Sequence, residues 1–191
     1  MKILVMCGSP RKQANTRILA RAVEDLVRDR NIDLLSFDVR HDRLPLFEMD
    51  EEGGPYPALV KLRNDARAAD GMVICTPEYH NGISGALKNA LDFLGSDVFA
   101  EKGIVILASS GGGKGGINAL NQLRLVMRSL SGYVLPGQFI VDPDDVLPGD
   151  PPGLRHECRN RLAGLVEQLV QFTAARMDVV GSRRRGTTTS T

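Results

Sequence analysis

The feature that most constrains the fold of this chain is an alternation of short apolar runs with segments of helical periodicity. Each apolar run is rich in Ile, Leu and Val and suits a strand buried on both faces. We expect strands at residues 2–7, 32–39, 72–75, 103–108 and 133–141. Stripes of apolar residues at helical spacing predict helices at residues 15–27, 59–66, 84–94, 117–130 and 154–177. Five strands alternating with five helices predict an α/β fold, a parallel sheet with helices on both faces.

The loop after the first expected strand, residues 8–16, suits a phosphate. It reads Gly-Ser-Pro-Arg-Lys-Gln-Ala-Asn-Thr and leads into a helix. A helix N-terminus offers free backbone N–H groups, and Arg11 can add a bidentate contact. Ser9, Asn15 and Thr16 can add side-chain hydrogen bonds. The alternative is that Asn15 only caps the helix and that Arg11 is an ordinary surface charge.

The loop after the third strand, residues 76–82, suits a planar ligand. It reads Thr-Pro-Glu-Tyr-His-Asn-Gly. Tyr79 can flank a ring, while backbone groups of a turn stiffened by Pro and Gly can meet the polar edge of that ring. The alternative is an ordinary turn before a helix capped by Ser84, with Tyr79 as a half-buried packing residue.

The loop after the fourth strand, residues 109–116, reads Ser-Ser-Gly-Gly-Gly-Lys-Gly-Gly. Glycines without a Cβ let a backbone approach a flat ligand closely. Gly111, Gly113 and Gly116 also match the G-x-G-x-x-G dinucleotide fingerprint, but the expected acidic residue about 20 positions later is not clearly placed. The loop is not a P-loop, because Gly115 stands where that motif requires Ser or Thr.

Strand order can bring these three loops together. In a flavodoxin-like sheet with strand order 2-1-3-4-5, strands one, three and four are neighbours, and FMN binds at the switch point between strands one and three. We therefore expect a flavodoxin-like three-layer sandwich, a five-stranded parallel sheet in that order, over residues 1–179. One loop would hold a phosphate and the other two an isoalloxazine. Residues 180–191, which are rich in Arg, Ser, Thr and Gly, are expected to form a disordered tail.

A long motif after the third strand carries a resemblance to a known family. Residues 76–93, Thr-Pro-Glu-Tyr-His-Asn-Gly-Ile-Ser-Gly-Ala-Leu-Lys-Asn-Ala-Leu-Asp-Phe, resemble the NAD(P)H-dependent FMN reductase family, which includes flavin, azo, quinone and chromate reductases. The other two loops fall where that family has its other flavin loops. His80 and Ser84 stand where many members have Asn and Pro, and both variants are familiar among azoreductase-like members.

The resemblance implies a set of FMN-binding residues and no catalytic residue, because the flavin itself carries the redox chemistry. His80 is expected to serve as a hydrogen-bonding residue of its loop. The implied phosphate ligands are Ser9, Arg11, Asn15 and Thr16. The residues implied to line the flavin are Pro77, Glu78, Tyr79, His80, Asn81 and Gly82, and those at its pyrimidine edge are Ser109, Ser110, Gly111 and Gly112.

The implied function is hydride transfer from NAD(P)H through bound FMN to a flavin, quinone, azo or similar acceptor. Three loops of one domain are already committed to FMN, so we expect donor and acceptor to share one pocket in a ping-pong mechanism. Residues 40–55 and a neighbouring subunit would then set specificity, since the family commonly forms homodimers or homotetramers.

Two alternatives remain open. One is a flavodoxin-type electron carrier without its own NAD(P)H reductase activity, although the first loop differs from the Thr-x-Thr-Gly-x-Thr pattern that flavodoxins resemble. The other is a dehydrogenase that uses the glycine-rich loop for NAD.

Composition and residue spacing limit the partners and the kinds of site that we expect. With 24 Lys and Arg against 23 Asp and Glu, the net charge of +1 gives no argument for a nucleic-acid partner. No apolar stretch approaches the ~20 residues that span a bilayer, so no membrane partner and a cytoplasmic location are expected. Three cysteines without C-x-x-C spacing suggest reduced core residues. Three scattered histidines argue against a metal site, and residues 142–152 suggest a plain connection.

Overall fold

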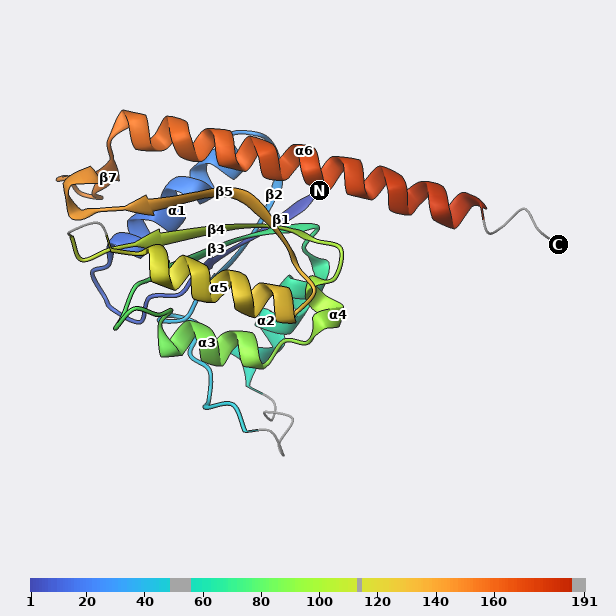
Figure 1. The fold of residues 1–191 in the computed structure, drawn as a ribbon, viewed down its shortest axis with the longest axis horizontal. Coiled ribbons are helices and arrows are strands. Elements are labelled where there is room, and N and C mark those ends of the chain that lie inside the picture. Colours follow the sequence, from blue (N-terminus) through green and yellow to red (C-terminus); the bar gives the residue numbers. More distant parts are fainter. Residues whose placement is uncertain (49–55, 113–114, 187–191) are drawn as a thin grey trace.

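The computed structural model describes residues 1–48, 56–112 and 115–186, and its main feature is a five-stranded parallel sheet (Figure 1). The strands lie in the order β2-β1-β3-β4-β5, which confirms the predicted flavodoxin-like order. Their bounds are β1 (Lys2–Cys7), β2 (Asp33–Asp38), β3 (Gly71–Pro77), β4 (Gly103–Ser109) and β5 (Tyr133–Val141).

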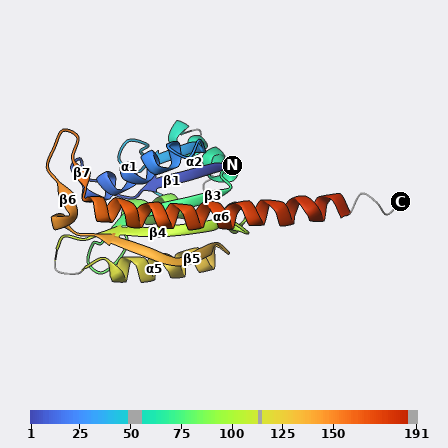
Figure 2. The ribbon, with the colours of Figure 1, turned by 90° about the horizontal axis from the view of Figure 1, so that it is seen from above.

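Helices cover both faces of this sheet, as predicted (Figures 1 and 2). On one face lie α1 (Asn15–Arg28) and α6 (His156–Gly186). The opposite face is covered by α2 (Pro57–Ala68), α3 (Gly85–Asp92), α4 (Ser96–Phe99) and α5 (Ile117–Ser129).

The hydrophobic core has two layers, because alternate residues of each strand face opposite sides of the sheet. In β1, Val5 and Cys7 belong to the layer under α1 and α6, whereas Leu4 and Met6 belong to the other layer. β3 and β4 are buried along their whole lengths. This two-sided burial explains why these strands appear in the sequence as continuous apolar runs.

The segment after β5 is more ordered than a plain connection, so that prediction is wrong. A 3-10 helix spans Pro143–Asp145, and β6 (Val146–Leu147) pairs with β7 (Gly153–Leu154) as a short antiparallel hairpin. Elements of two or three residues are too short to show periodicity. The four-residue helix α4 was missed in the sequence for the same reason.

Helix α6 is longer than its apolar stripe indicated. It runs past residue 179, where the domain was expected to end, and continues to Gly186. Figures 1 and 2 show its last turns extending beyond the edge of the sheet. Residues 187–191 of the expected tail lie outside the described residues. None of the described helices is both long and apolar enough to cross a bilayer.

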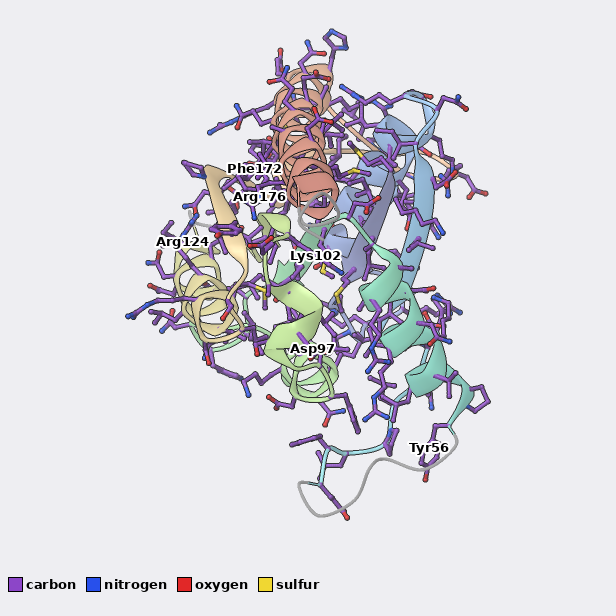
Figure 3. All side chains as sticks on the ribbon, turned by 90° about the vertical axis from the view of Figure 1, so that its right-hand side faces the viewer. Tyr56, Asp97, Lys102, Arg124, Phe172 and Arg176 are labelled. Atoms are coloured by element: carbon purple, nitrogen blue, oxygen red, sulfur yellow. The ribbon has the colours of Figure 1, made fainter. Side chains whose placement is uncertain are left out.

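The amino-terminal edge of the sheet is closed by polar contacts (Figure 3). The ammonium group of Lys102 donates to the carbonyl oxygen of Ala66 over 2.7 Å, at the C-terminal end of α2. Arg176, on α6, pairs with Glu101 at 2.7 Å and lies over the ring of Tyr133. These contacts join α2 and α6 to the starts of the strands. The loops that follow β1, β3 and β4 lie at the opposite, carboxyl edge of the sheet.

Candidate functional site

The loops after β1, β3 and β4 line one hollow at the carboxyl edge of the sheet. Its volume is about 410 Å³. Parallel strands end at the same edge, so neighbouring strands place their following loops side by side. The lining residues are Ser9, Arg11, Gln13, Ala14, Asn15, Thr16, Pro77, Glu78, Tyr79, Ser109, Ser110, Gly111 and Pro143.

The lining contains residues from all three predicted loops but leaves four of the predicted residues out. Those four are His80, Asn81, Gly82 and Gly112. The first three belong to the far end of the loop after β3, and the fourth follows the part of the glycine-rich loop that reaches the hollow. Their part in ligand binding stays a prediction.

Three lining residues were not predicted from the sequence. Gln13 and Ala14 lie inside the first loop, and their positions just before a helix start were the signal that could have found them. Pro143 begins the 3-10 helix after β5. Nothing in its residue type distinguishes it from the other prolines of that segment.

The N-terminus of α1 opens into the hollow without a side-chain cap. Ala14 is the N-cap residue, and no side chain of the described residues accepts a hydrogen bond there. The alternative that Asn15 only caps the helix is therefore wrong. The N–H groups of a first helical turn have no partner inside the helix, so this end of α1 suits an anion. Arg11, exposed at the rim, adds a positive charge.

Two hydroxyl groups connect this helix to β4 at the base of the hollow. The side-chain oxygens of Thr16 and Ser109 lie 2.5 Å apart, and both residues are buried. Each hydroxyl has one proton and two acceptor sites. Whichever hydroxyl accepts this bond keeps its own proton for a ligand.

The loop after β3 ends in a tight two-residue turn. Tyr79 and Gly82 exchange two backbone hydrogen bonds of 2.9 and 3.0 Å. The residues between them, His80 and Asn81, have φ angles of 50° and 63°, and positive φ at both central positions is typical of a type I′ turn. The side-chain amide oxygen of Asn81 (Oδ1) accepts a hydrogen bond from the side-chain amide of Asn118 on α5 at 3.2 Å. In this turn His80 is exposed, and it is not among the residues that line the hollow.

Glu78 and Tyr79 occupy the wall between this turn and β3. One carboxylate oxygen of Glu78 accepts from the N–H of Ala119 at 2.9 Å, so Glu78 supplies the cap that Gly116 cannot give α5. The Tyr79 hydroxyl is buried and has no hydrogen-bond partner among the described residues. A buried hydroxyl normally has a partner, and this one belongs to a residue that lines the hollow.

The glycine-rich loop is fixed at its base. The hydroxyl of Ser110 donates to the carboxylate of Asp142 and accepts from the N–H of Gly112 at 3.2 Å. Gly112 and Gly116 have φ angles of 113° and 99°, which favour glycine. A dinucleotide fingerprint follows the first strand of its fold, whereas this loop follows β4. The dehydrogenase alternative therefore lacks its expected topology.

The three cysteine thiols are buried, and burial raises the pKa of each. The pKa reaches about 12 for Cys7 and about 11 for Cys158. None is a thiolate at neutral pH, so none suits nucleophilic chemistry. They behave as the core residues that the sequence suggested.

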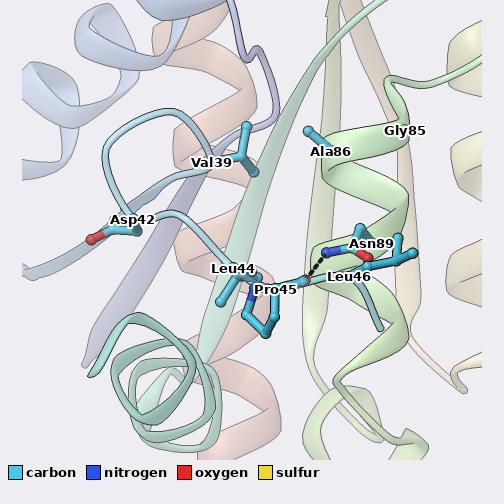
Figure 4. Close-up of a pocket in the computed structure, with 8 residues that line it drawn as sticks. All are labelled: Val39, Asp42, Leu44, Pro45, Leu46, Gly85, Ala86 and Asn89. Atoms are coloured by element: carbon cyan, nitrogen blue, oxygen red, sulfur yellow. Dashed lines mark hydrogen bonds between the residues drawn. The ribbon is translucent and has the colours of Figure 1, made fainter. Parts of the chain in front are cut away.

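A second hollow, of about 300 Å³, lies between the loop after β2 and the start of α3 (Figure 4). Its walls include Leu44, Leu46 and Ala86. The side chain of Asn89 holds the loop in place: its amide donates to the Pro45 carbonyl at 2.8 Å, and its oxygen accepts from the Phe47 N–H at 2.8 Å. This segment is the described part of residues 40–55, the loop expected to set specificity.

The strand order and the shared hollow define a flavodoxin-like α/β protein with a candidate ligand site at the carboxyl edge of its sheet. The family model of NADPH-dependent FMN reductases matches residues 1–145, and the chain belongs to that family. Membership confirms the predicted class of enzyme, an NAD(P)H-dependent oxidoreductase with FMN as cofactor and NAD(P)H as co-substrate.

Curated relatives match over most of their own lengths. A protein named NADPH azoreductase, from Bacillus sp. (strain OY1-2), is 36% identical over 179 residues, which cover 94% of this chain and 96% of the relative. A protein named FMN-dependent NADPH-azoreductase, from Staphylococcus aureus (strain USA300), is 33% identical over 152 residues, or 76% of this chain and 79% of the relative.

Solved structures share the fold at lower identity. The flavoenzyme NAD(P)H:(acceptor) oxidoreductase FerB from Paracoccus denitrificans has a TM-score of 0.76 and 21% identity, covering 92% of this chain and 98% of that chain. A flavodoxin from the domain Archaea has a TM-score of 0.64 and 13% identity, covering 91% and 99%. An enzyme and a flavodoxin thus share this fold, and the fold by itself does not choose between catalysis and electron carriage.

The hollow fits FMN on its own chemistry. Its walls offer donors for a phosphate at the start of α1. Tyr79, in the loop expected to face the flavin, has a buried hydroxyl with no hydrogen-bond partner among the described residues. Gly111 has open space where a Cβ would stand, so a flat group can approach its backbone closely.

Proposed function

We propose that this protein reduces small planar acceptors of the azo, quinone or flavin type, with NAD(P)H as the reductant and FMN held in the hollow of the three loops. The observation that carries the proposal is the convergence of these loops on an uncapped helix N-terminus. An azo acceptor has the most support, because two relatives that cover most of this chain are named azoreductases.

The residues of the hollow divide the work of holding FMN. The first turn of α1 and the guanidinium of Arg11 would bind the phosphate. Pro77 and Tyr79 would flank the isoalloxazine, and the backbone at Ser110 and Gly111 would meet its pyrimidine edge. The hydroxyl pair of Thr16 and Ser109 would close the base of the site against water.

When bound, FMN would supply the redox chemistry that links NAD(P)H to the acceptor. The chain's own part is positioning. Glu78, whose carboxylate is used in capping α5, keeps the loop after β3 at a fixed distance from the glycine-rich loop. Donor and acceptor must each come within about 3–3.5 Å of the same reacting atom, so they would occupy one place in turn.

The loop after β2 and a neighbouring subunit would select the acceptor. Leu46 is 76% exposed beside the second hollow, although its neighbours on both sides are bonded to Asn89. Leu46 is thus an exposed apolar side chain on a segment whose backbone is held by hydrogen bonds. Such a side chain suits contact with an apolar acceptor or with another copy of this chain. We therefore propose a homodimer or homotetramer, which sedimentation of the purified protein would test.

Steady-state kinetics test the proposed reaction. The purified protein should be yellow, should be bleached by NADPH without a partner protein, and should reduce an azo dye and a quinone. Initial rates at several fixed acceptor concentrations should give parallel double-reciprocal lines. Intersecting lines together with a detectable enzyme–NADPH–acceptor complex would rule out the shared pocket.

The electron-carrier alternative predicts a different result in the same assay. A flavodoxin-type carrier would bind FMN but would be reduced by NADPH only when a reductase is added. Rapid bleaching of the isolated protein would exclude it. The cytoplasmic location expected from the sequence stays a prediction, which cell fractionation would check.

A further inference from the structure

We infer that Arg17 and Asp38 form a positioning pair that makes the loop after β1 specific for a phosphate, although neither residue lines the hollow. The inference rests on the proposed function, because it concerns the same FMN site. Its starting point is that every donor of one buried guanidinium is used. Arg17 is only 8% exposed, and it lies in the first turns of α1.

The Arg17 guanidinium binds backbone carbonyl oxygens of the loop after β1. Its Nη1 donates to the carbonyl oxygens of Arg11 and Lys12 at 2.6 and 2.9 Å. Its Nη2 donates to the carbonyl oxygen of Ser9 at 3.0 Å. An arginine has five N–H donors in a fixed planar arrangement, and three of them are used on this loop.

The remaining two donors of Arg17 bind Asp38 at the end of β2. Nε and Nη2 donate to the two carboxylate oxygens at 2.6 and 3.0 Å, the bidentate geometry that arginine favours. Asp38 pairs with Cys7 in the β1–β2 register, so the carboxylate stands beside the start of the loop. Because this carboxylate neutralises the guanidinium, the pair adds no net charge near the hollow. Its contribution is to fix the conformation of the loop after β1.

Asp38 also binds the backbone of a second arginine, Arg40, whose side chain contacts the same loop. The backbone N–H of Arg40 donates to an Asp38 carboxylate oxygen at 2.9 Å, and the Arg40 side chain donates to the Pro10 carbonyl at 2.9 Å. The four successive carbonyl oxygens of residues 9–12 are therefore each bonded to an arginine.

This arrangement leaves the loop with donors facing the other way. In a trans peptide the C=O and the following N–H point in opposite directions. Turning the Arg11 and Lys12 carbonyls toward Arg17 turns the N–H groups of Lys12 and Gln13 away from it. Among the described residues those two N–H groups have no acceptor, and Gln13 lines the hollow. With its carbonyls held back, the loop presents donors that favour an anion and no acceptors that repel one.

The test compares FMN with riboflavin, which has the same ring system without the phosphate. Flavin-free wild type and variants are titrated with each, and quenching of flavin fluorescence gives both dissociation constants. Arg17→Met should weaken FMN binding by about tenfold or more and leave riboflavin binding unchanged. Arg17→Lys should behave similarly, because one ammonium group cannot reach all these acceptors. Inorganic phosphate should compete with FMN in wild type and not in Arg17→Met.

Two further variants are needed: Asp38→Asn, which tests the other member of the pair, and Arg21→Met, which is the control. Asp38→Asn keeps the size of the side chain and loses the charge, so it should reduce the preference for FMN over riboflavin by less than Arg17→Met does. If Arg17→Met does not fold, as judged by circular dichroism, Arg17→Lys and Asp38→Asn carry the comparison. Arg21→Met removes the same charge from an exposed position one turn along α1 and should change neither constant.

The outcomes separate this inference from the function on which it rests. If wild type binds neither FMN nor riboflavin, the proposed function fails. If wild type prefers FMN and the Arg17 and Asp38 variants keep the same preference, the positioning pair is overturned while the proposed function stands. Equal loss of FMN and riboflavin binding in the variants would also overturn it, because that result indicates a general loss of structure.

Discussion

Single residues of this site serve either the ligand or the fold, and their burial tells the two apart. Arg11 is exposed at the rim of the hollow, whereas Arg17, six residues later, is buried against backbone carbonyls. Substitutions at these two arginines should therefore differ in kind. Loss of the exposed residue affects binding alone, while loss of the buried residue also affects the flavin-free protein.

Arg11→Ala should lower FMN affinity without changing the stability of the flavin-free protein. It would remove the proposed charge-assisted contact to the phosphate, worth about 1.5–3 kcal/mol, which is roughly ten- to 150-fold in affinity. Fluorescence titration measures the affinity, and urea denaturation measures the stability. Lys12→Ala, an exposed neighbour outside the hollow lining, is the matched control. FMN binding as tight as wild type in Arg11→Ala would place the phosphate elsewhere.

The Arg17–Asp38 pair should make stability depend on pH in the acid range. Burial alone would raise the pKa of Asp38, but the hydrogen bonds from Arg17 and from the Arg40 N–H bring this pKa below its ordinary value. A lowered carboxyl pKa gives stability that is present above the unfolded pKa of about 3.9 and is lost as the pH falls through the folded pKa.

Asp38→Asn should therefore be less stable than wild type near neutral pH, by about 1–3 kcal/mol. The difference should shrink as the pH falls below about 4, since wild type then loses the ionised carboxylate as well. Urea denaturation of both flavin-free proteins from pH 7 to pH 3 measures this difference. A gap of constant size across that range would show that Asp38 does not titrate as the structure indicates.

At the scale of elements, the loop after β2 is joined to α3 by one carboxamide rather than by packing alone. Asn89 makes two hydrogen bonds to the backbone of residues 45 and 47, and the ring of Phe47 stands edge-on to Phe93 with 5.2 Å between centroids. The resemblance placed Asn89 in a motif of the family, and the structure gives that residue a physical task.

Asn89→Ala should change acceptor use while FMN stays bound. It leaves the Pro45 carbonyl and the Phe47 N–H without their partner, so the loop loses its fixed position over the second hollow. The KM for azo and quinone acceptors should shift, while the FMN dissociation constant should not. Lys88→Ala, the exposed preceding residue, is the control. Acceptor KM values identical to wild type across a panel would mean that this loop does not select the acceptor.

Elements with a clear period were predictable, and those without one were not. The strands and the long helices follow from apolar runs of four or more residues and from stripes at helical spacing. The β6–β7 hairpin and α4 are too short for such a signal. Arg17 was missed because a lone arginine on a helix resembles a solvated one, and its partner Asp38 is 21 residues away. Only the pairing of β1 with β2 brings the two together.

For the whole molecule, the hollow is built on the edge of the sheet, because strand order places the three loops side by side. The sequence predicted which loops would meet, since few topologies suit alternating strands and helices and the flavodoxin-like order is one of them. It did not predict how far each loop reaches into the hollow, whose lining leaves out His80 and Asn81; their part in ligand binding stays a prediction. That detail depends on the tight turn after β3. The turn was not predicted because its positive φ angles occur at two residues that are not glycine.

Because all three loops belong to the folded state only, FMN should stabilise the entire domain against unfolding. A ligand that binds only the native state adds RT ln(1 + [L]/Kd), or about 2.7 kcal/mol at a hundred times the dissociation constant. For a domain of this size about 1 kcal/mol raises Tm by roughly 2–4 °C, so saturating FMN should raise Tm by about 5–10 °C. Scanning calorimetry of flavin-free protein with and without FMN measures the shift.

Riboflavin at the same concentration should raise Tm by less than FMN does, because it cannot use the start of α1 or Arg11. The Tm shift with FMN should grow by the same increment for each tenfold rise in concentration above the dissociation constant, as the logarithm requires. A single transition should be seen throughout, since one domain carries all three loops. Two transitions, of which FMN moves only one, would mean that the site belongs to a part of the molecule that unfolds separately, and the three-loop assignment would then be wrong.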